Sequence, residues 1–263
     1  MVIDFHTHAF PDAIASRAIE TLMEISGSIT PNTDGTVGSL IDVMDQNGVD
    51  KSVLLNIATN IKQMKKVNDF AAAVNGGRIV SFGSVHPDAP DAIEELYRIK
   101  ELGLKGIKLH PDYQSFFVDE ERLLPLYETI GKLSLITVFH SGVDIGYYDP
   151  VHCSPERLSR VLPAFSGAPV VAAHFGGYMQ WYDVEQYLVG KNVYFDTGYA
   201  YSRMPNDHGK RIVKNHGADK ILFGSDMPWS NVKNELVFIK AMHLEQDEEN
   251  LILGRNAQRL LEL

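Results

Sequence analysis

Short runs of mainly apolar residues recur along the chain, separated by stretches in which apolar residues return every three to four positions. The runs predict parallel β-strands buried on both faces, because a half-exposed strand would alternate polar and apolar side chains. The stretches between them predict amphipathic helices. Over residues 11–25, for example, Ile14, Ala18, Leu22 and Ile25 fall on one helix face. The predicted strands cover residues 2–8, 52–58, 78–85, 106–110, 133–140, 168–174, 192–196 and 220–226.

Eight strands alternating with helices over 263 residues predict an α/β fold, a single (β/α)8 barrel of the TIM type, which commonly spans about 250 residues. A doubly wound open sheet is the alternative arrangement of these elements. No linker divides the chain, so residues 1–263 are expected to form one domain. The one insertion, residues 9–38, follows the first strand and is expected to fold over the barrel mouth.

Composition narrows the choice of partner. The formal net charge of −10 argues against nucleic acid or an anionic membrane surface, and no apolar stretch approaches the roughly 20 residues of a membrane span. The single Cys153 excludes an internal disulfide framework and fits a reducing compartment. The start of the chain lacks the pattern of a signal peptide. We therefore expect a cytoplasmic protein that acts on a small molecule.

Six of the ten histidines fall at the carboxyl end of a predicted strand. In a barrel these ends converge on one mouth, where active sites are built. The six are His6, His8, His86, His110, His140 and His174. Asp226 ends the eighth strand in the same way. The other histidines, His152, His208, His216 and His243, fall on loops and helices and are expected at the surface.

His6 and His8 are separated by one residue, so both side chains point to the same side of a strand, roughly 7 Å apart along it. Two imidazoles held in this way can bind one metal ion, and His140, His174 and Asp226 converge on them from other strands. Neutral imidazoles and a carboxylate suit zinc and similar divalent ions. Such a site can activate a water molecule on the metal, with a carboxylate that takes the proton of that water and an imidazole that polarises the substrate oxygen.

Several motifs carry a resemblance to a known family. They are Asp4-Phe-His-Thr-His8, Gly106-Ile-Lys-Leu-His-Pro111, His174-Phe-Gly-Gly177, Phe195-Asp-Thr-Gly198, Gly224-Ser-Asp-Met-Pro-Trp229 and Ile252-Leu-Gly-Arg-Asn-Ala-Gln-Arg-Leu260. Over nearly its whole length the chain resembles the amidohydrolase superfamily, and in particular the "amidohydrolase 2" branch that includes aminocarboxymuconate-semialdehyde decarboxylase. The resemblance implies a (β/α)8 barrel of the metal-dependent hydrolase type and a divalent metal, usually Zn2+.

The resemblance also implies roles for individual residues. His6, His8 and His140 match metal ligands on the first and fifth strands. Asp226 matches an aspartate that is both a ligand and the proton shuttle. His174 matches a histidine that is catalytic in members with one metal and holds a second metal in members with two.

Lys108 decides between one metal ion and two. At a matching place, two-metal members carry a carboxylated lysine that bridges the ions. The alternative is an unmodified Lys108 that pairs with a nearby carboxylate such as Asp4, since an inward lysine is costly unless paired or modified. We favour the unmodified lysine and one ion, because the branch that the chain resembles mostly binds one.

Three functions remain open. The first is hydrolysis of a small amide, ester or lactone, with metal-activated water, Asp226 as proton shuttle and His174 polarising the substrate. The alternative is a metal-dependent, non-oxidative decarboxylase or hydratase of a small carboxylic acid, and a minor alternative is a non-catalytic metal-binding barrel. A homodimer is consistent with the branch. Candidate substrate-binding residues at or beyond the strand ends are His86, His110, Tyr178 and Trp229.

Overall fold

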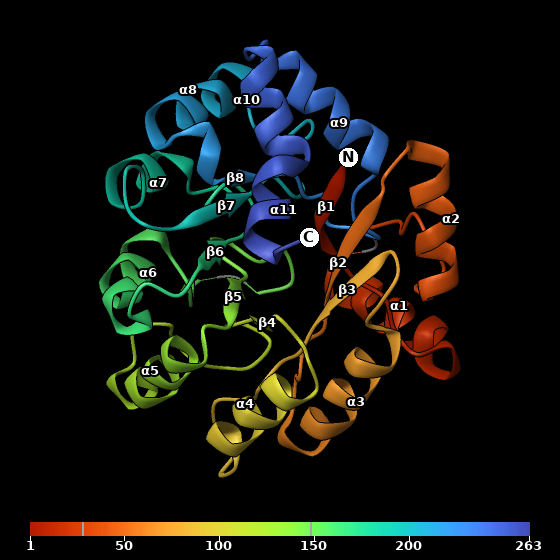
Figure 1. Ribbon diagram of the computed structural model, residues 1–263, viewed down its shortest axis with the longest axis vertical. Helices are drawn as coiled ribbons and strands as arrows, with labels where there is room; N and C mark the ends of the chain where they lie inside the picture. Colours follow the sequence, from red (N-terminus) through yellow and green to blue (C-terminus); the bar gives the residue numbers. More distant parts are fainter. Residues whose placement is uncertain (28, 148) are drawn as a thin grey trace.

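The structure is a computed structural model that describes residues 1–27, 29–147 and 149–263. Its strands lie at the centre with helices around them (Figure 1). The strands are β1 (Ile3–Thr7), β2 (Lys51–Leu55), β3 (Ile79–Phe82), β4 (Gly106–Leu109), β5 (Ile136–Phe139), β6 (Val170–Ala172), β7 (Tyr194–Asp196) and β8 (Ile221–Leu222). The α-helices are α1 (Asp12–Ile25), α2 (Val37–Asn47), α3 (Met64–Val74), α4 (Ala92–Glu101), α5 (Leu124–Leu133), α6 (Pro155–Val161), α7 (Trp181–Tyr187), α8 (Asn206–His216), α9 (Val232–Ala241), α10 (Gln246–Asn250) and α11 (Asn256–Leu261). Shorter helical segments are η1 (Ile61–Gln63), η2 (Glu121–Leu123), η3 (Leu162–Phe165), η4 (Ala218–Lys220) and η5 (Leu251–Arg255).

The strands pair in chain order, and every pairing is parallel. One ladder contains β1, β2 and β3, and the other contains β4, β5, β6, β7 and β8. Isolated parallel bridges link the two ladders, Gly83 with Ile107 at one seam and Thr7 with Met227 at the other. A doubly wound sheet would reverse its strand order at a switch point, and this order contains no reversal. The predicted barrel fold is confirmed, although its ladder is not continuous at the two seams.

The C-terminal segment covers the amino-terminal end of the barrel. Ala257 and Leu261 of α11 share an apolar cluster with strand residues such as Ile3 and Phe5. The π-helical segment η5 packs so closely on the start of β1 that a Cβ on Gly254 would lie 2.2 Å from the Met1 carbonyl oxygen. The carboxyl ends of the strands are therefore the end at which a site can form.

The structure shortens several predicted elements. β3 ends at Phe82, so His86 lies four residues beyond it, and the predicted strand over residues 220–226 is reduced to Ile221–Leu222. Pro125 occupies the first turn of α5, where its missing N–H costs nothing. None of the helices in the described ranges is long and apolar enough to cross a membrane.

Two histidines predicted at the surface are buried instead. His216, at the end of α8, accepts a hydrogen bond at Nδ1 from the Gly190 amide and lies 2.8 Å at Nε2 from the Val193 carbonyl oxygen. Its ring stacks on Phe195 with centroids 4.1 Å apart. His208 is also buried, and its Nε2 lies 3.2 Å from Glu185. The surface assignment was wrong because helix periodicity alone does not show which polar residues bond to a neighbouring loop or helix.

Glu235 on α9 gives a test of the fold that is independent of catalysis. Its buried carboxylate accepts hydrogen bonds from the Ala200 and Tyr201 amides and from Ser230, and burial raises its pKa to about 7. The folded protein thus holds this proton more tightly than the unfolded chain, so stability falls as the pH rises from about 4.5 to about 7. We expect Glu235→Gln to raise the melting temperature at pH 8 and to leave it unchanged at pH 4.

Thermal unfolding at the two pH values measures this effect. Glu128→Gln, a change at an exposed position on α5, is the control and should behave like the wild type at both. A lower melting temperature of Glu235→Gln at pH 8 would mean that the hydrogen bonds to the ionised carboxylate outweigh the cost of burying it.

Candidate active site

His6 in β1 and His8 just after it lie close to Asp226, which follows β8. His6 Nε2 lies 3.1 Å from His8 Nε2. Asp226 Oδ1 lies 3.3 Å from His6 Nε2 and 3.4 Å from His8 Nε2. All three side chains are at least mostly buried. The structure therefore brings together three of the four predicted metal ligands, with one atom of each directed at the same point.

The second nitrogen of each histidine is held by the barrel. His6 Nδ1 lies 2.9 Å from Asp196 Oδ2 at the end of β7, and His8 Nδ1 lies 2.9 Å from the Leu55 carbonyl oxygen at the end of β2. A carbonyl or carboxylate oxygen only accepts, so each Nδ1 carries the proton and each Nε2 presents its lone pair. Burial, reinforced by Lys108, lowers the pKa of His6, and the Asp226 carboxylate acts in the opposite direction.

The three residues fit a divalent ion. Ligand atoms 2.0–2.2 Å from a tetrahedral ion are about 3.4 Å from one another, and the measured separations are 3.1, 3.3 and 3.4 Å. Burial alone would raise the pKa of Asp226, but His6 and His8 hold it below its ordinary value. The carboxylate is therefore ionised at neutral pH, as a ligand must be.

His140 and His174 lie beside this group. His174 Nε2 is 3.1 Å from His140 Nδ1, and His174 Nδ1 is 3.0 Å from the Gly198 carbonyl oxygen. The ring of His174 lies 5.0 Å from that of His6. His140 turns its Nε2 away, toward Asp144 at 3.6 Å, which is beyond hydrogen-bond distance. Only Nδ1 of His140 thus faces the cluster, and its role as fourth ligand stays a prediction.

The backbone is unusual at the residues that carry these groups. His174, Phe175 and Asp226 have φ values of 61°, 55° and 66°, a left-handed conformation uncommon outside glycine. The His174 amide donates to Asp196 and the Asp226 amide donates to the His6 carbonyl oxygen. These bonds hold the backbone in place, and such local strain tends to gather at functional sites.

Asp144 is a site residue that the sequence did not reveal. It follows β5 in a loop, and its Oδ2 lies 3.5 Å from His110 Nε2 as well as near His140. The rings of His110 and His140 stack with centroids 4.2 Å apart. Together these residues form a second group of metal-type ligands next to the first. Its position four residues after His140 is the only signal that the sequence offered.

Lys108 projects from β4 into the same space. Its side chain is 1% exposed, its Nζ lies 3.5 Å from His6 Nε2, and burial lowers its pKa to about 8. The predicted pairing with Asp4 is not formed, because Asp4 accepts hydrogen bonds from the amide and hydroxyl of Ser225 instead. Lys108 is therefore a buried cation against the histidine cluster, and among the described residues no carboxylate forms an ion pair with it.

A cavity of about 890 Å³ opens onto these groups. Of the four candidate substrate-binding residues, His110, Tyr178 and Trp229 line it, and their role stays a prediction; His86 is absent from the part of its wall that the structure describes. His86 is tied to its own loop, since its Nδ1 accepts from the Asp88 amide. Much of α1, from the insertion after β1, forms another part of the wall.

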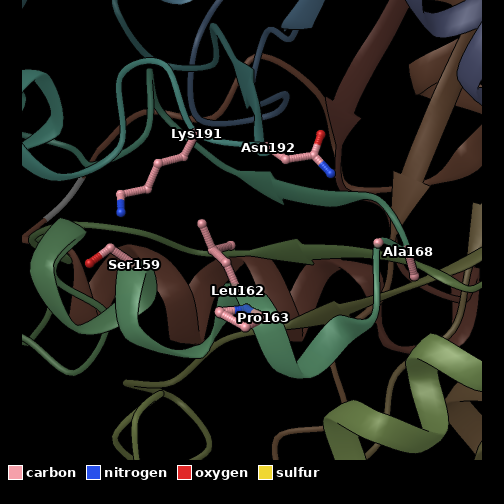
Figure 2. Close-up of a pocket in the computed structure, with 7 residues that line it drawn as sticks. Ser159, Leu162, Pro163, Ala168, Lys191 and Asn192 are labelled. Atoms are coloured by element: carbon pink, nitrogen blue, oxygen red, sulfur yellow. The ribbon is translucent and has the colours of Figure 1, made fainter.

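A smaller hollow of about 310 Å³ lies elsewhere (Figure 2). Ala168 and Asn192 in its wall precede β6 and β7, so it sits at the amino-terminal side of those strands. Leu162 and Pro163 of η3 form the facing wall. Within the described residues the wall of the hollow holds one charged side chain, Lys191.

Asp196 provides a direct test of the cluster. Its Oδ1 accepts from the His174 and Gly198 amides while its Oδ2 accepts from His6 Nδ1. In Asp196→Asn the amide NH2 would face Nδ1, which would move the proton of His6 to Nε2 and block the ligand atom. We expect metal affinity to fall by about 10- to 100-fold, measured by competition with a chromogenic chelator. Asp183→Asn on α7 is the control, and equal affinity of both variants would contradict the assignment.

Comparisons with known proteins identify a family and agree with the fold. A family model described as "Amidohydrolase" matches residues 3–263. An uncharacterized TIM-barrel protein from Bordetella bronchiseptica is 21% identical, with a TM-score of 0.77 over 99% of this chain and 98% of that one. A 2,6-dihydroxybenzoate decarboxylase is 18% identical, with a TM-score of 0.73 and 100% and 99% of the chains covered. A dihydroxybenzoic acid decarboxylase from Polaromonas sp. JS666, solved with manganese and the inhibitor 2-nitroresorcinol, is 18% identical, with a TM-score of 0.69 and 100% and 97% covered. No curated protein matches the chain.

Proposed function

Since the chain belongs to the amidohydrolase family, we propose that it is a metal-dependent enzyme that removes carbon dioxide from a small carboxylic acid. The observation that carries this proposal is the buried Lys108 ammonium, 3.5 Å from His6 Nε2, next to a cavity whose wall is largely apolar. A cation at that place favours an anionic group of the substrate beside the His6–His8–Asp226 cluster. Two similar structures with decarboxylase names support the same choice.

The chain's own residues supply the rest of the chemistry. His6, His8 and Asp226 would hold the divalent ion, which when bound supplies a Lewis acid beside the substrate carboxylate. Lys108 binds and orients that carboxylate by its charge. The apolar walls exclude water, which favours the neutral product carbon dioxide over the charged carboxylate. The identity of the metal is part of the proposal, with zinc and manganese as the ions to test.

The reaction exchanges a carboxylate for a proton. The bond between the substrate carbon and the carboxylate breaks, its electron pair stays on the substrate carbon, and a proton is delivered there. We assign this proton to His174, which as an imidazolium would give up its Nε2 proton and become neutral, while its Nδ1 proton stays hydrogen-bonded to the Gly198 carbonyl oxygen. The proton is then restored from solvent through the cavity.

Hydrolysis of an ester, amide or lactone is the second candidate. It is favoured by the ionised Asp226 carboxylate, which can take a proton from water in the cavity. The same cluster of residues serves both reactions, so the product distinguishes them. A retained metal-binding barrel without catalysis is the remaining alternative.

The test is product analysis with 13C-carboxyl-labelled aromatic and unsaturated acids, alongside a panel of esters and lactones. We expect labelled carbon dioxide from at least one acid, loss of that activity after chelation, and its return with Zn2+ or Mn2+. Acid release from a lactone or ester without carbon dioxide from any acid would assign the hydrolase instead. Metal binding with no turnover in either panel would favour the non-catalytic barrel.

A further inference from the structure

Helix α1 has two apolar faces, and one of them is only partly covered by the rest of the protein. Its buried residues are Ala15 and Ile19, and Ile19 lies against the Gly35 backbone, where a Cβ would come within 2.7 Å of it. The other face carries the apolar residues Ile14, Ala18, Leu22 and Ile25, hereafter the α1 stripe. Ile14 remains 52% exposed and Ile25 39% exposed.

The α1 stripe borders the candidate active site. All four of its residues line the same cavity of about 890 Å³ that contains His6, His8 and Asp226. Val67 and Phe70 of α3 also line this cavity. The exposed apolar surface is therefore continuous with the candidate active site.

The size of the cavity exceeds what a small acid needs. Ligand pockets typically measure about 300–1,000 Å³ and bury most of a drug-sized ligand, so this one lies near the upper end. A substrate with a single ring would leave the α1 stripe in contact with water. An exposed apolar patch of this kind usually marks the place where an apolar partner binds.

We propose that the substrate of this site carries an apolar extension, such as an alkyl chain or a second ring, that packs along the α1 stripe. The inference rests on the proposed function, because it places the carboxylate of the same substrate at Lys108 and the His6–His8–Asp226 cluster. Ile14 and Ile25 are then specificity-determining residues, and the insertion after β1 is the element that selects the substrate's tail.

The test uses a series of benzoates with alkyl substituents of increasing length, studied by binding calorimetry and by turnover. Each added methylene should tighten binding to the wild type by up to about fourfold, since burying one CH2 contributes about 0.8 kcal/mol. In Ile14→Ser/Ile25→Ser, affinity for the longest member should fall at least tenfold more than affinity for unsubstituted benzoate. Ile14→Val/Ile25→Val should recover most of the difference.

Ile93→Ser is the matched control, because Ile93 is 38% exposed on α4 and does not line the described wall of the cavity. The inference would be overturned if the length of the alkyl substituent had no effect on wild-type affinity. It would also be overturned if Ile14→Ser/Ile25→Ser lost the same affinity for short and long benzoates. A change in molar mass of the serine variants in solution would instead assign the stripe to contact with a second copy of the chain, and would also overturn it. Calorimetry separates this inference from the proposed decarboxylase function. Binding that strengthens with alkyl length, without release of carbon dioxide, would contradict the decarboxylase function and leave the inference standing.

Discussion

Replacing Asp226 by asparagine is expected to lower kcat/KM by about 10³-fold, because both candidate reactions need the metal that Asp226 would hold and the hydrolytic alternative also needs its carboxylate to move a proton. Asp226 Oδ1 lies within 3.4 Å of both His6 Nε2 and His8 Nε2, which places it to hold the metal in either reaction. Asparagine keeps the shape and one oxygen but carries no charge and cannot take a proton. Metal affinity should fall together with activity, because the uncharged amide is a weaker ligand for a divalent ion.

The measurement is metal content and kcat/KM on the same preparation, with and without added metal. Asp42→Asn, an exposed change on α2, is the control and should match the wild type in both. The fold should survive in Asp226→Asn, because the Asp226 amide still donates to the His6 carbonyl oxygen. Activity that returns fully when metal is added in excess would restrict Asp226 to metal binding and exclude the proton transfer that the hydrolytic alternative gives it.

The grouping of His6, His8 and Asp226 could be predicted from the sequence because of their positions relative to the predicted strands. His6, His8 and Asp226 follow or end parallel strands, and parallel strands in a barrel bring their carboxyl ends together whatever the loops do. His174 and Lys108 follow the same rule, and the structure places both beside His6. Strand periodicity therefore predicted which side chains meet, without any knowledge of the connecting segments.

Side chains that depend on loops were not accessible in this way. Asp144 reaches His110 and His140 from the irregular segment after β5, and no periodicity constrains such a segment. The partner of Asp4 was also missed, because Ser225 lies in the segment after β8, which strand periodicity does not constrain. The Asp4 carboxylate bonds to Ser225 on the far end of the chain, and the expected pairing with Lys108 is lost.

The two faces of α1 show a further limit of periodicity. The apolar spacing of Ile14, Ala18, Leu22 and Ile25 predicted the helix correctly, and α1 covers Asp12–Ile25. Such a stripe usually marks the face that packs into the core. Here Ala15 and Ile19 fill that place and the stripe lines the cavity. A sequence pattern gives the apolar face of a helix but not what it contacts.

Replacing Lys108 by methionine is expected to reduce kcat/KM by about 100-fold while leaving the melting temperature unchanged or higher. Methionine has a similar length and is readily accommodated in a core, and replacing a buried charge by an apolar group is often neutral or stabilising. The loss should fall mainly on carboxylate substrates, since the ammonium is the cation next to His6. Comparison of kcat/KM for an acid and for a neutral ester of the same size measures that selectivity.

The same variant decides how many ions the site holds. An unmodified Lys108 with one ion per chain predicts that Lys108→Met keeps the metal stoichiometry of the wild type, since His6, His8 and Asp226 are untouched. A carboxylated Lys108 that bridges two ions predicts two per wild-type chain and loss of one in the variant. Lys66→Met, a change in an exposed side chain in the wall of the same cavity, controls for a general loss of positive charge. Unchanged stoichiometry together with lost activity would leave Lys108 as a binder of the substrate carboxylate, whereas a lost ion would make its carbamate part of the metal centre.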